Sequence, residues 1–153
     1  MDAPAPLDVE EELLWRALTR LAIALPRDLD ADLLQDTGLS LTEYGALMNL
    51  SEAPHRQLRM AELASATGMS ASRITRVVDR LQKQELITKQ RCDGDGRGFV
   101  AVLTELGLSR LREAYPSHLA SARRRVFAHL APSQIPAVGN ALRSIVIAAE
   151  RGQ

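Results

Sequence analysis

Six small polar or cationic side chains occur between residues 70 and 80 of this 153-residue chain. Hydroxyl and guanidinium groups form hydrogen bonds with the edges of DNA bases and with phosphates, and arginine can donate two parallel bonds to either. Their spacing places most of them on the outward face of one helix, which Ser70 would cap. This face predicts contact with DNA. The six residues are Ser70, Ser72, Arg73, Thr75, Arg76 and Arg80.

Two helices that cross at a tight turn would position these side chains. In residues 60–81, Ala64 lets the second helix approach closely and Gly68 takes the turn, while an apolar face is formed by Leu63, Ile74, Val77 and Leu81. This is a helix-turn-helix pattern, in which the second helix enters the major groove. We expect Ser72 and Arg76 to contact bases and Arg80, farther along, to contact phosphate.

The segment after this pattern strengthens the prediction, because a helix-turn-helix alone also occurs in domains that bind no DNA. Residues 86–91 are β-prone, residues 93–98 are DGDGRG, and residues 99–104 alternate apolar side chains, which predicts a β-hairpin. Such a hairpin is a wing. At its tip, Arg97 can enter a minor groove while Asp95 orients it by a charge-assisted hydrogen bond. Arg91 is the third wing residue expected at the DNA.

The charge distribution agrees with a double-stranded partner. The formal net charge is zero, but residues 1–50 carry 3 basic and 10 acidic side chains, residues 51–100 carry 9 and 6, and residues 101–153 carry 7 and 3. The acidic end should therefore face away from phosphate. Aromatic residues make up only 3% of the chain, which argues against a platform for stacking single-stranded bases.

Composition argues against several other classes of protein. A single cysteine excludes an internal disulfide and a zinc site built from several cysteines, and His55, His118 and His129 lack the spacing of metal ligands, so we expect neither metal nor cofactor. The first residues lack the basic start and apolar core of a signal peptide, and no apolar run is long enough to span a bilayer. We expect a cytoplasmic protein with no membrane partner.

Four further helices are expected around the winged segment. Capping patterns open the first two, at residues 8–26 and 40–53, and Thr104 opens a long helix that continues to Val126, with Pro116 kinking it or relaxing one turn. A last helix begins near Ser133. The predicted fold is mainly α with a small β-hairpin, an α+β winged helix-turn-helix.

The first and last helices carry more apolar surface than a small winged domain can cover. We therefore expect a second copy of the chain as partner, and a two-fold homodimer on a palindromic site. This organisation divides the chain into a dimerisation helix with its connection (1–38), a DNA-binding domain (39–104), and a long helix with a second dimerisation helix (105–153).

The chain resembles the MarR family of winged-helix regulators over nearly all of its length. Residues 40–50, SLTEYGALMNL, resemble the family's second helix, and residues 95–107, DGRGFVAVLTELG, resemble its wing signature. The resemblance implies a homodimer with interlocked terminal helices, bound to a pseudo-palindromic operator and often released by a small anionic or phenolic ligand. Repression is the usual outcome in the family, although activation and competition with another factor also occur. The matching wing positions are Asp95, Arg97, Leu103, Thr104 and Gly107.

Two positions depart from the family pattern. Glu85 follows the recognition helix where the family usually has Gly, so either a left-handed turn is kept at a cost of about 1 kcal/mol or the chain turns differently. Gly45 and Ala46 replace bulkier mid-helix residues. Their small side chains leave room for a neighbouring side chain or for a ligand.

The resemblance also implies an effector cleft between the dimer helices and the winged domain. The candidates by position are Trp15, Tyr44, Met48 and His118. The alternative is that the two aromatic residues belong to the core or the interface. Cys92 is interpreted as an incidental thiol, because Arg91 and Asp93 on either side oppose each other in charge and the peroxide-sensing cysteine of some relatives lies near the N-terminus.

Three other functions compete with this one. An enzyme is not indicated, because the chain has no phosphate-cradling loop, no Gly-x-Ser-x-Gly elbow and no grouping of His, Cys and acid with a plausible mechanism. The outward-facing arginines argue against a winged-helix module that binds protein instead of DNA. A DNA-binding protein without a small-molecule effector remains an alternative.

Overall fold

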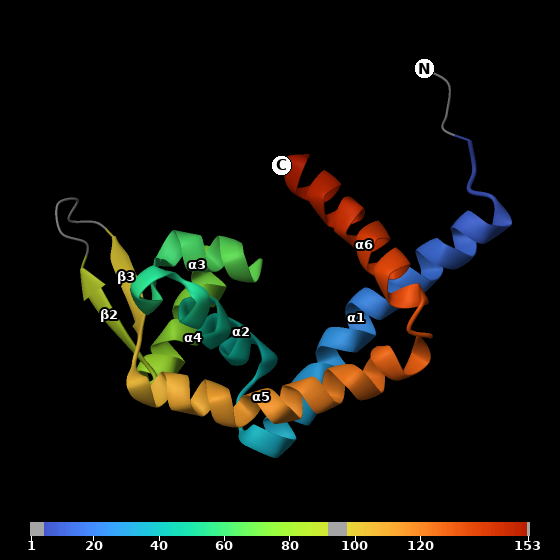
Figure 1. Cartoon of the computed structure of the whole chain (residues 1–153). Helices are drawn as coiled ribbons and strands as arrows, with labels where there is room; N and C mark the ends of the chain where they lie inside the picture. Colours follow the sequence, from blue (N-terminus) through green and yellow to red (C-terminus); the bar gives the residue numbers. More distant parts are fainter. Residues whose placement is uncertain (1–4, 92–97, 153) are drawn as a thin grey trace. The chain divides into compact units, whose positions relative to one another are not determined.

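The computed structural model describes residues 5–91 and 98–152 of the chain (Figure 1). It is mainly helical with one small antiparallel sheet, which confirms the predicted α+β winged helix-turn-helix. The chain divides into two compact units, residues 1–118 and 119–153. The functional boundaries expected after residues 38 and 104 stay a prediction.

Helix α1, Val9–Thr37, begins as expected and ends later than expected. The Asp8 carboxylate accepts a hydrogen bond from Glu11 N at 2.8 Å, and the Glu11 carboxylate accepts one from Asp8 N at 2.9 Å. The predicted end at Pro26 is wrong, since the helix continues through this residue to Gly38.

Contacts at the far end of α1 explain why the proline does not end it. Proline inside a helix costs about 3 kcal/mol, so the turns beyond it need anchoring. Ser117 Oγ donates a hydrogen bond to the Asp36 carboxylate at 2.6 Å, and the Arg110 guanidinium donates one to the carbonyl of Thr37. Gly38 closes the helix in a left-handed conformation, φ +74°.

Helix α2, Leu41–Glu52, has the predicted bounds. Ser40 and Glu43 form the expected capping box, and Ala53 terminates the helix before Pro54. The carboxylate of Asp30 in α1 accepts a hydrogen bond from Leu41 N at 2.7 Å, so a second acidic side chain secures the first turn. The inward face is fully buried and includes Ala46, Leu47 and Leu50.

Helices α3, Met60–Thr67, and α4, Ala71–Lys83, form the predicted helix-turn-helix. Gly68 adopts φ +64° at the turn, and the Ser70 hydroxyl accepts a hydrogen bond from Arg73 N at 3.3 Å. All the side chains expected between the two helices are buried, and Val78 joins them. They are Leu63, Ala64, Ile74, Val77 and Leu81.

The end of α4 keeps the left-handed geometry despite having no glycine. Glu85 has φ +61°, its N–H donates to the carbonyl of Gln82, and the N–H of Leu86 donates to the carbonyl of Leu81, both at 3.0 Å. These two bonds define a Schellman motif, the C-terminal cap that glycine usually closes. Of the two alternatives for Glu85, the structure shows the strained one.

The sheet contains three strands in the order β1-β3-β2. Strands β2, Ile87–Arg91, and β3, Phe99–Leu103, form the predicted hairpin, in which Ile87 pairs with Leu103 and Arg91 with Phe99. Strand β1, Gln57–Arg59, was not predicted; it pairs with β3 and follows a short 3₁₀ turn at Pro54–Arg56. Figure 1 shows α2, α3 and α4 packed beside this sheet.

Helix α5, Glu105–Arg125, starts at Thr104 as predicted and continues through Pro116. The Thr104 hydroxyl accepts a hydrogen bond from Gly107 N at 2.9 Å and donates one to the carbonyl of Glu85 at 2.8 Å. Val126 lies just beyond the helix, with φ −123°, so the predicted continuation of this helix to Val126 is wrong. Val126 precedes a 3₁₀ segment, Phe127–His129.

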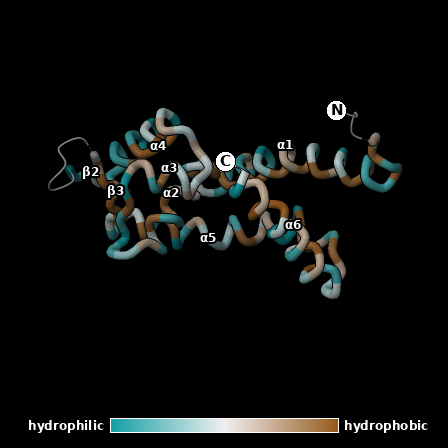
Figure 2. The backbone as a smooth tube through the Cα atoms, turned by 90° about the horizontal axis from the view of Figure 1, so that it is seen from above, coloured by the Kyte–Doolittle hydropathy of each residue, from teal (hydrophilic) through white to brown (hydrophobic). Residues whose placement is uncertain are grey.

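Large apolar side chains are exposed on α1 and on helix α6, Gln134–Arg151. On α6 they include Val138, Leu142, Ile145 and Val146, and on α1 they include Leu13 and Leu14. Figure 2 shows hydrophobic positions recurring along both helices. Among the described residues, no helix has the length and apolar character needed to cross a membrane.

Candidate nucleic-acid interface and ligand pocket

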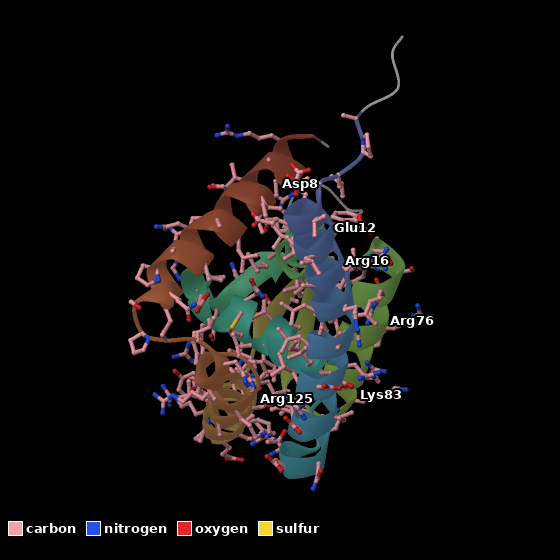
Figure 3. The ribbon with its side chains drawn as sticks, turned by 90° about the vertical axis from the view of Figure 1, so that its right-hand side faces the viewer. Asp8, Glu12, Arg16, Arg76, Lys83 and Arg125 are labelled. Atoms are coloured by element: carbon pink, nitrogen blue, oxygen red, sulfur yellow. The ribbon has the colours of Figure 1, made fainter. Side chains whose placement is uncertain are left out.

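The outward face of α4 carries the side chains that the sequence predicts at DNA. All six residues from Ser70 to Arg80 in this set are exposed, and the Thr75 hydroxyl donates to the carbonyl of Ala71 at 2.8 Å. Figure 3 shows Arg76 and Lys83 of α4 projecting away from the packed helices. The structure therefore gathers hydroxyl and guanidinium groups on one accessible helical face.

Arg80 differs from the other arginines of α4 because it is anchored. Its Nε lies 3.1 Å from a carboxylate oxygen of Glu43, a residue of α2 whose side chain is only 8% exposed. The Arg80 side chain itself is 57% exposed. The sequence predicts only a capping role for Glu43 and gives no sign of this pair, because residues 43 and 80 come together only in the folded chain.

The wing is fixed to the recognition helix by a second ion pair. Lys89 of β2 pairs with Asp79 of α4, a contact that the sequence analysis also missed. Arg91 is exposed at the end of β2. Cys92, Asp95 and Arg97 lie outside the described residues, so the expectations for them stay predictions.

A pocket of about 370 Å³ lies between α2 and α5. It brings together two of the four predicted ligand residues, Tyr44 and Met48. His118 adjoins it, because its ring centroid lies 4.5 Å from that of Tyr44. Trp15 is not among the lining residues and is 59% exposed on α1. The other lining residues are Ser51, Glu52, Leu108, Leu111, Arg112 and Tyr115.

Burial shifts the pKa values of these two neighbouring rings, whose planes are tilted by 31°. Desolvation lowers the pKa of His118, and its Nδ1 is buried without a hydrogen-bond partner among the described residues. Desolvation also raises the pKa of Tyr44, with smaller contributions from Tyr115 and Glu52. Both shifts favour the neutral form, so a neutral phenol lines the pocket and a neutral imidazole lies behind it.

Arg112 and Tyr115 are pocket residues that the sequence analysis did not select. A signal for them was available, because positions 108, 111, 112 and 115 follow the i, i+3, i+4, i+7 spacing of one helical face. Arg112 gives the pocket a cation and Glu52 gives it an acid. Within the described ranges 5–91 and 98–152, no group of three or more His, Cys, Asp or Glu side chains is arranged to hold a metal ion.

Comparison with known proteins agrees with this arrangement. Residues 37–98 match the model of the MarR family. The crystal structure of Sco3205, a MarR family transcriptional regulator from Streptomyces coelicolor in complex with DNA, is 37% identical and superposes with a TM-score of 0.87, covering 95% of this chain and 91% of that one. The chain belongs to the MarR family. The resemblance inferred from the sequence is thereby confirmed.

Two further relatives of this MarR-family protein support the assignment. AbsC, another MarR family transcriptional regulator from Streptomyces coelicolor, is also 37% identical, with a TM-score of 0.86 over 98% of this chain and 100% of that one. The transcriptional repressor MprA of Escherichia coli strain K12 is 32% identical over 102 residues, which are 65% of this chain and 58% of the repressor. The chain thus spans a little over half of that curated relative. The relatives that it matches are transcriptional regulators.

Proposed function

We propose that this MarR-family protein is a cytoplasmic repressor that binds a specific sequence of double-stranded DNA. The observation that carries the proposal is the exposed face of α4, where hydroxyls and arginines stand clear of the packed core. The complex of Sco3205 with DNA supports DNA binding, and the name of MprA supports repression.

Each predicted DNA residue has a role in this proposal. Ser72 and Arg76, near the start of α4, contact bases in the major groove, since arginine donates bidentate bonds to guanine. Arg80 contacts phosphate. The wing enters the adjacent minor groove. In the wing, Arg97 inserts into that groove and Asp95 orients Arg97. The remaining residues expected to contact the DNA are Ser70, Arg73, Thr75 and Arg91.

We propose a homodimer as the active form. The exposed apolar side chains of α1 and of α6 support it, because water contact with such surfaces is unfavourable and a second copy would bury them. Residues 1–38 and 105–153 would then serve dimerisation, and residues 39–104 DNA binding. Two recognition helices in successive major grooves would bind a pseudo-palindrome with half-sites about 10 base pairs apart.

We further propose that a small anionic or phenolic ligand releases the DNA. The pocket between α2 and α5 supports this, because its volume of about 370 Å³ suits a small molecule, Arg112 would attract an anion, and Tyr44 offers an aromatic wall. Helix α2 lines this pocket through Tyr44 and also pairs with the recognition helix through Glu43. A ligand that displaces α2 would therefore act on Arg80.

A titration with labelled nucleic acids tests the proposed function. Full-length protein is added to a random-sequence duplex and to the corresponding single strand, and anisotropy is recorded at several salt concentrations. We expect binding to the duplex that weakens steeply with salt and is stronger than binding to the single strand. No salt-dependent binding would favour a module that binds protein. Duplex binding that no aromatic anion affects would favour the ligand-independent alternative.

A further inference from the structure

Glu43 and Glu62 are each the third residue of a helix, α2 and α3, but their surroundings differ. Glu43 of α2 accepts a hydrogen bond from Ser40 N at 2.9 Å, and Glu62 of α3 accepts one from Arg59 N at 2.8 Å. Both therefore cap a first turn. Glu62 is exposed and takes part in no ion pair found in the described residues, whereas Glu43 is buried and pairs with Arg80.

The carboxylate of Glu43 is held rigidly. One oxygen accepts from both the N–H and the hydroxyl of Ser40, each at 2.9 Å, and the other faces Arg80 Nε at 3.1 Å. Its 8% exposure leaves little room for another rotamer. Because its own position is fixed, Glu43 can fix the position of whatever it binds.

Among the described residues, the guanidinium group of Arg80 is paired through one edge. The pair with Glu43 engages Nε, and the remaining donors are on the two Nη atoms. The side chain is 57% exposed and borders a pocket of about 320 Å³ that Arg73 and the first turn of α2 also line. Arg80 thus lies beside open space that Arg27 and Asp30 of α1 also line, and its Nη donors are available to a phosphate group.

We propose that Glu43 is a positioning residue for DNA binding, which orients Arg80 so that its Nη atoms meet a backbone phosphate. The proposal rests on the DNA-binding function proposed above. This proposal and simple electrostatics predict opposite changes in DNA affinity when the charge of Glu43 is removed. Removing an acid near DNA should strengthen binding electrostatically, whereas removing a positioning residue should weaken it.

The first test compares Glu43→Gln with the matched control Glu62→Gln in the full-length protein. Each change removes one charge from a capping glutamate, but only the first releases an arginine of the recognition helix. Binding to a random-sequence duplex is measured at several salt concentrations. We expect Glu43→Gln to lose about tenfold in affinity and about one phosphate contact from the salt dependence, and Glu62→Gln to bind as well as the wild type or better.

A double-mutant cycle separates positioning from a general structural effect. Arg80→Lys keeps a cation beside Glu43, so the fold is retained, but its single ammonium cannot bind the carboxylate and present a planar fork to phosphate. We expect it to lose affinity as Glu43→Gln does, and the double variant to lose no more than either single variant. Thermal unfolding followed by circular dichroism verifies that each variant is folded at the assay temperature.

The outcomes distinguish this proposal from the function on which it rests. If the wild type fails to bind duplex DNA, the proposed function fails. If the wild type binds and folded Glu43→Gln binds equally well or more tightly, the positioning role is refuted and the function stands. Losses that add in the double variant would also refute it.

Discussion

At the scale of single residues, Glu85 has a strained backbone conformation in the folded protein. It is left-handed, φ +61°, at the end of the recognition helix, a conformation that costs a residue with a Cβ about 1 kcal/mol or more. Its N–H and that of Leu86 still cap the helix. The strain is tolerated because this turn connects the end of α4 to the start of β2.

Replacing Glu85 with glycine should therefore stabilise the protein. We expect Glu85→Gly to raise the free energy of unfolding by about 1 kcal/mol, reduced in part by the greater freedom of glycine in the unfolded chain. Urea unfolding measures the change. Gly68→Ala, which introduces a Cβ at φ +64°, is the opposite control and should destabilise. A glycine variant less stable than the wild type would contradict the account of this turn.

His118 should make stability depend on pH. Burial lowers its pKa in the folded protein, so between that value and the unfolded pKa of about 6.5 the unfolded chain binds more protons. Neutral His118 therefore imposes no penalty on the folded state above about pH 6.5, and the free energy of unfolding decreases as pH falls below this value. When pH is lowered from about 7.5 to about 5.5, we expect the free energy of unfolding to decrease more for the wild type than for His118→Gln. A difference that is constant with pH would show that His118 titrates normally.

At the scale of elements, local signals predicted the helix starts better than the helix ends. The capping residues Asp8 and Ser40 act within one turn, so the sequence is sufficient to place them. The continuation of α1 past Pro26 depends on Arg110 and Ser117, which are remote in sequence. Strand β1 has three residues and exists only because β3 pairs with it, so no local pattern could predict it.

Gly107 lets helix α5 pack closely against the backbone of Leu86, the residue before β2. A Cβ at this position would lie 2.1 Å from the carbonyl oxygen of Leu86, which is backbone and cannot rotate away. We expect Gly107→Ala to cost about 1 to 3 kcal/mol of stability. Gly45→Ala is the matched control, because nothing lies within 4 Å of its Cβ position, and helix propensity should stabilise it by about 1 kcal/mol. Equal effects of the two changes in thermal unfolding would contradict this account.

At the scale of the whole molecule, the sequence predicted the surfaces better than the contacts beneath them. The exposed face of α4 follows from helical periodicity, and Tyr44 and Met48 do line a pocket. Trp15 does not, because α1 carries it on an exposed stretch. The pairs Glu43–Arg80 and Asp79–Lys89 join different elements, so only the folded chain reveals them.

The proposed dimer should be visible in solution. Light scattering of the 16.8 kDa chain at micromolar concentration should give twice the monomer mass. Ile145→Asp, which places a charge on the exposed apolar face of α6, should shift the protein toward monomer, while Asn140→Asp on the same helix should have a smaller effect. A stable, folded monomer of the wild type at these concentrations would rule out an obligate dimer.

The central claim is that the outward face of α4 recognises DNA sequence as a symmetric pair, and selection of bound sequences from random duplex tests it most directly. The wild type should enrich an inverted repeat with half-sites about 10 base pairs apart. Arg76→Ala should lose preference at one or two base pairs in each half-site, a cost of about 1 to 3 kcal/mol on the operator. No enriched sequence, a single unrepeated half-site, or an unchanged motif with Arg76→Ala would contradict the account.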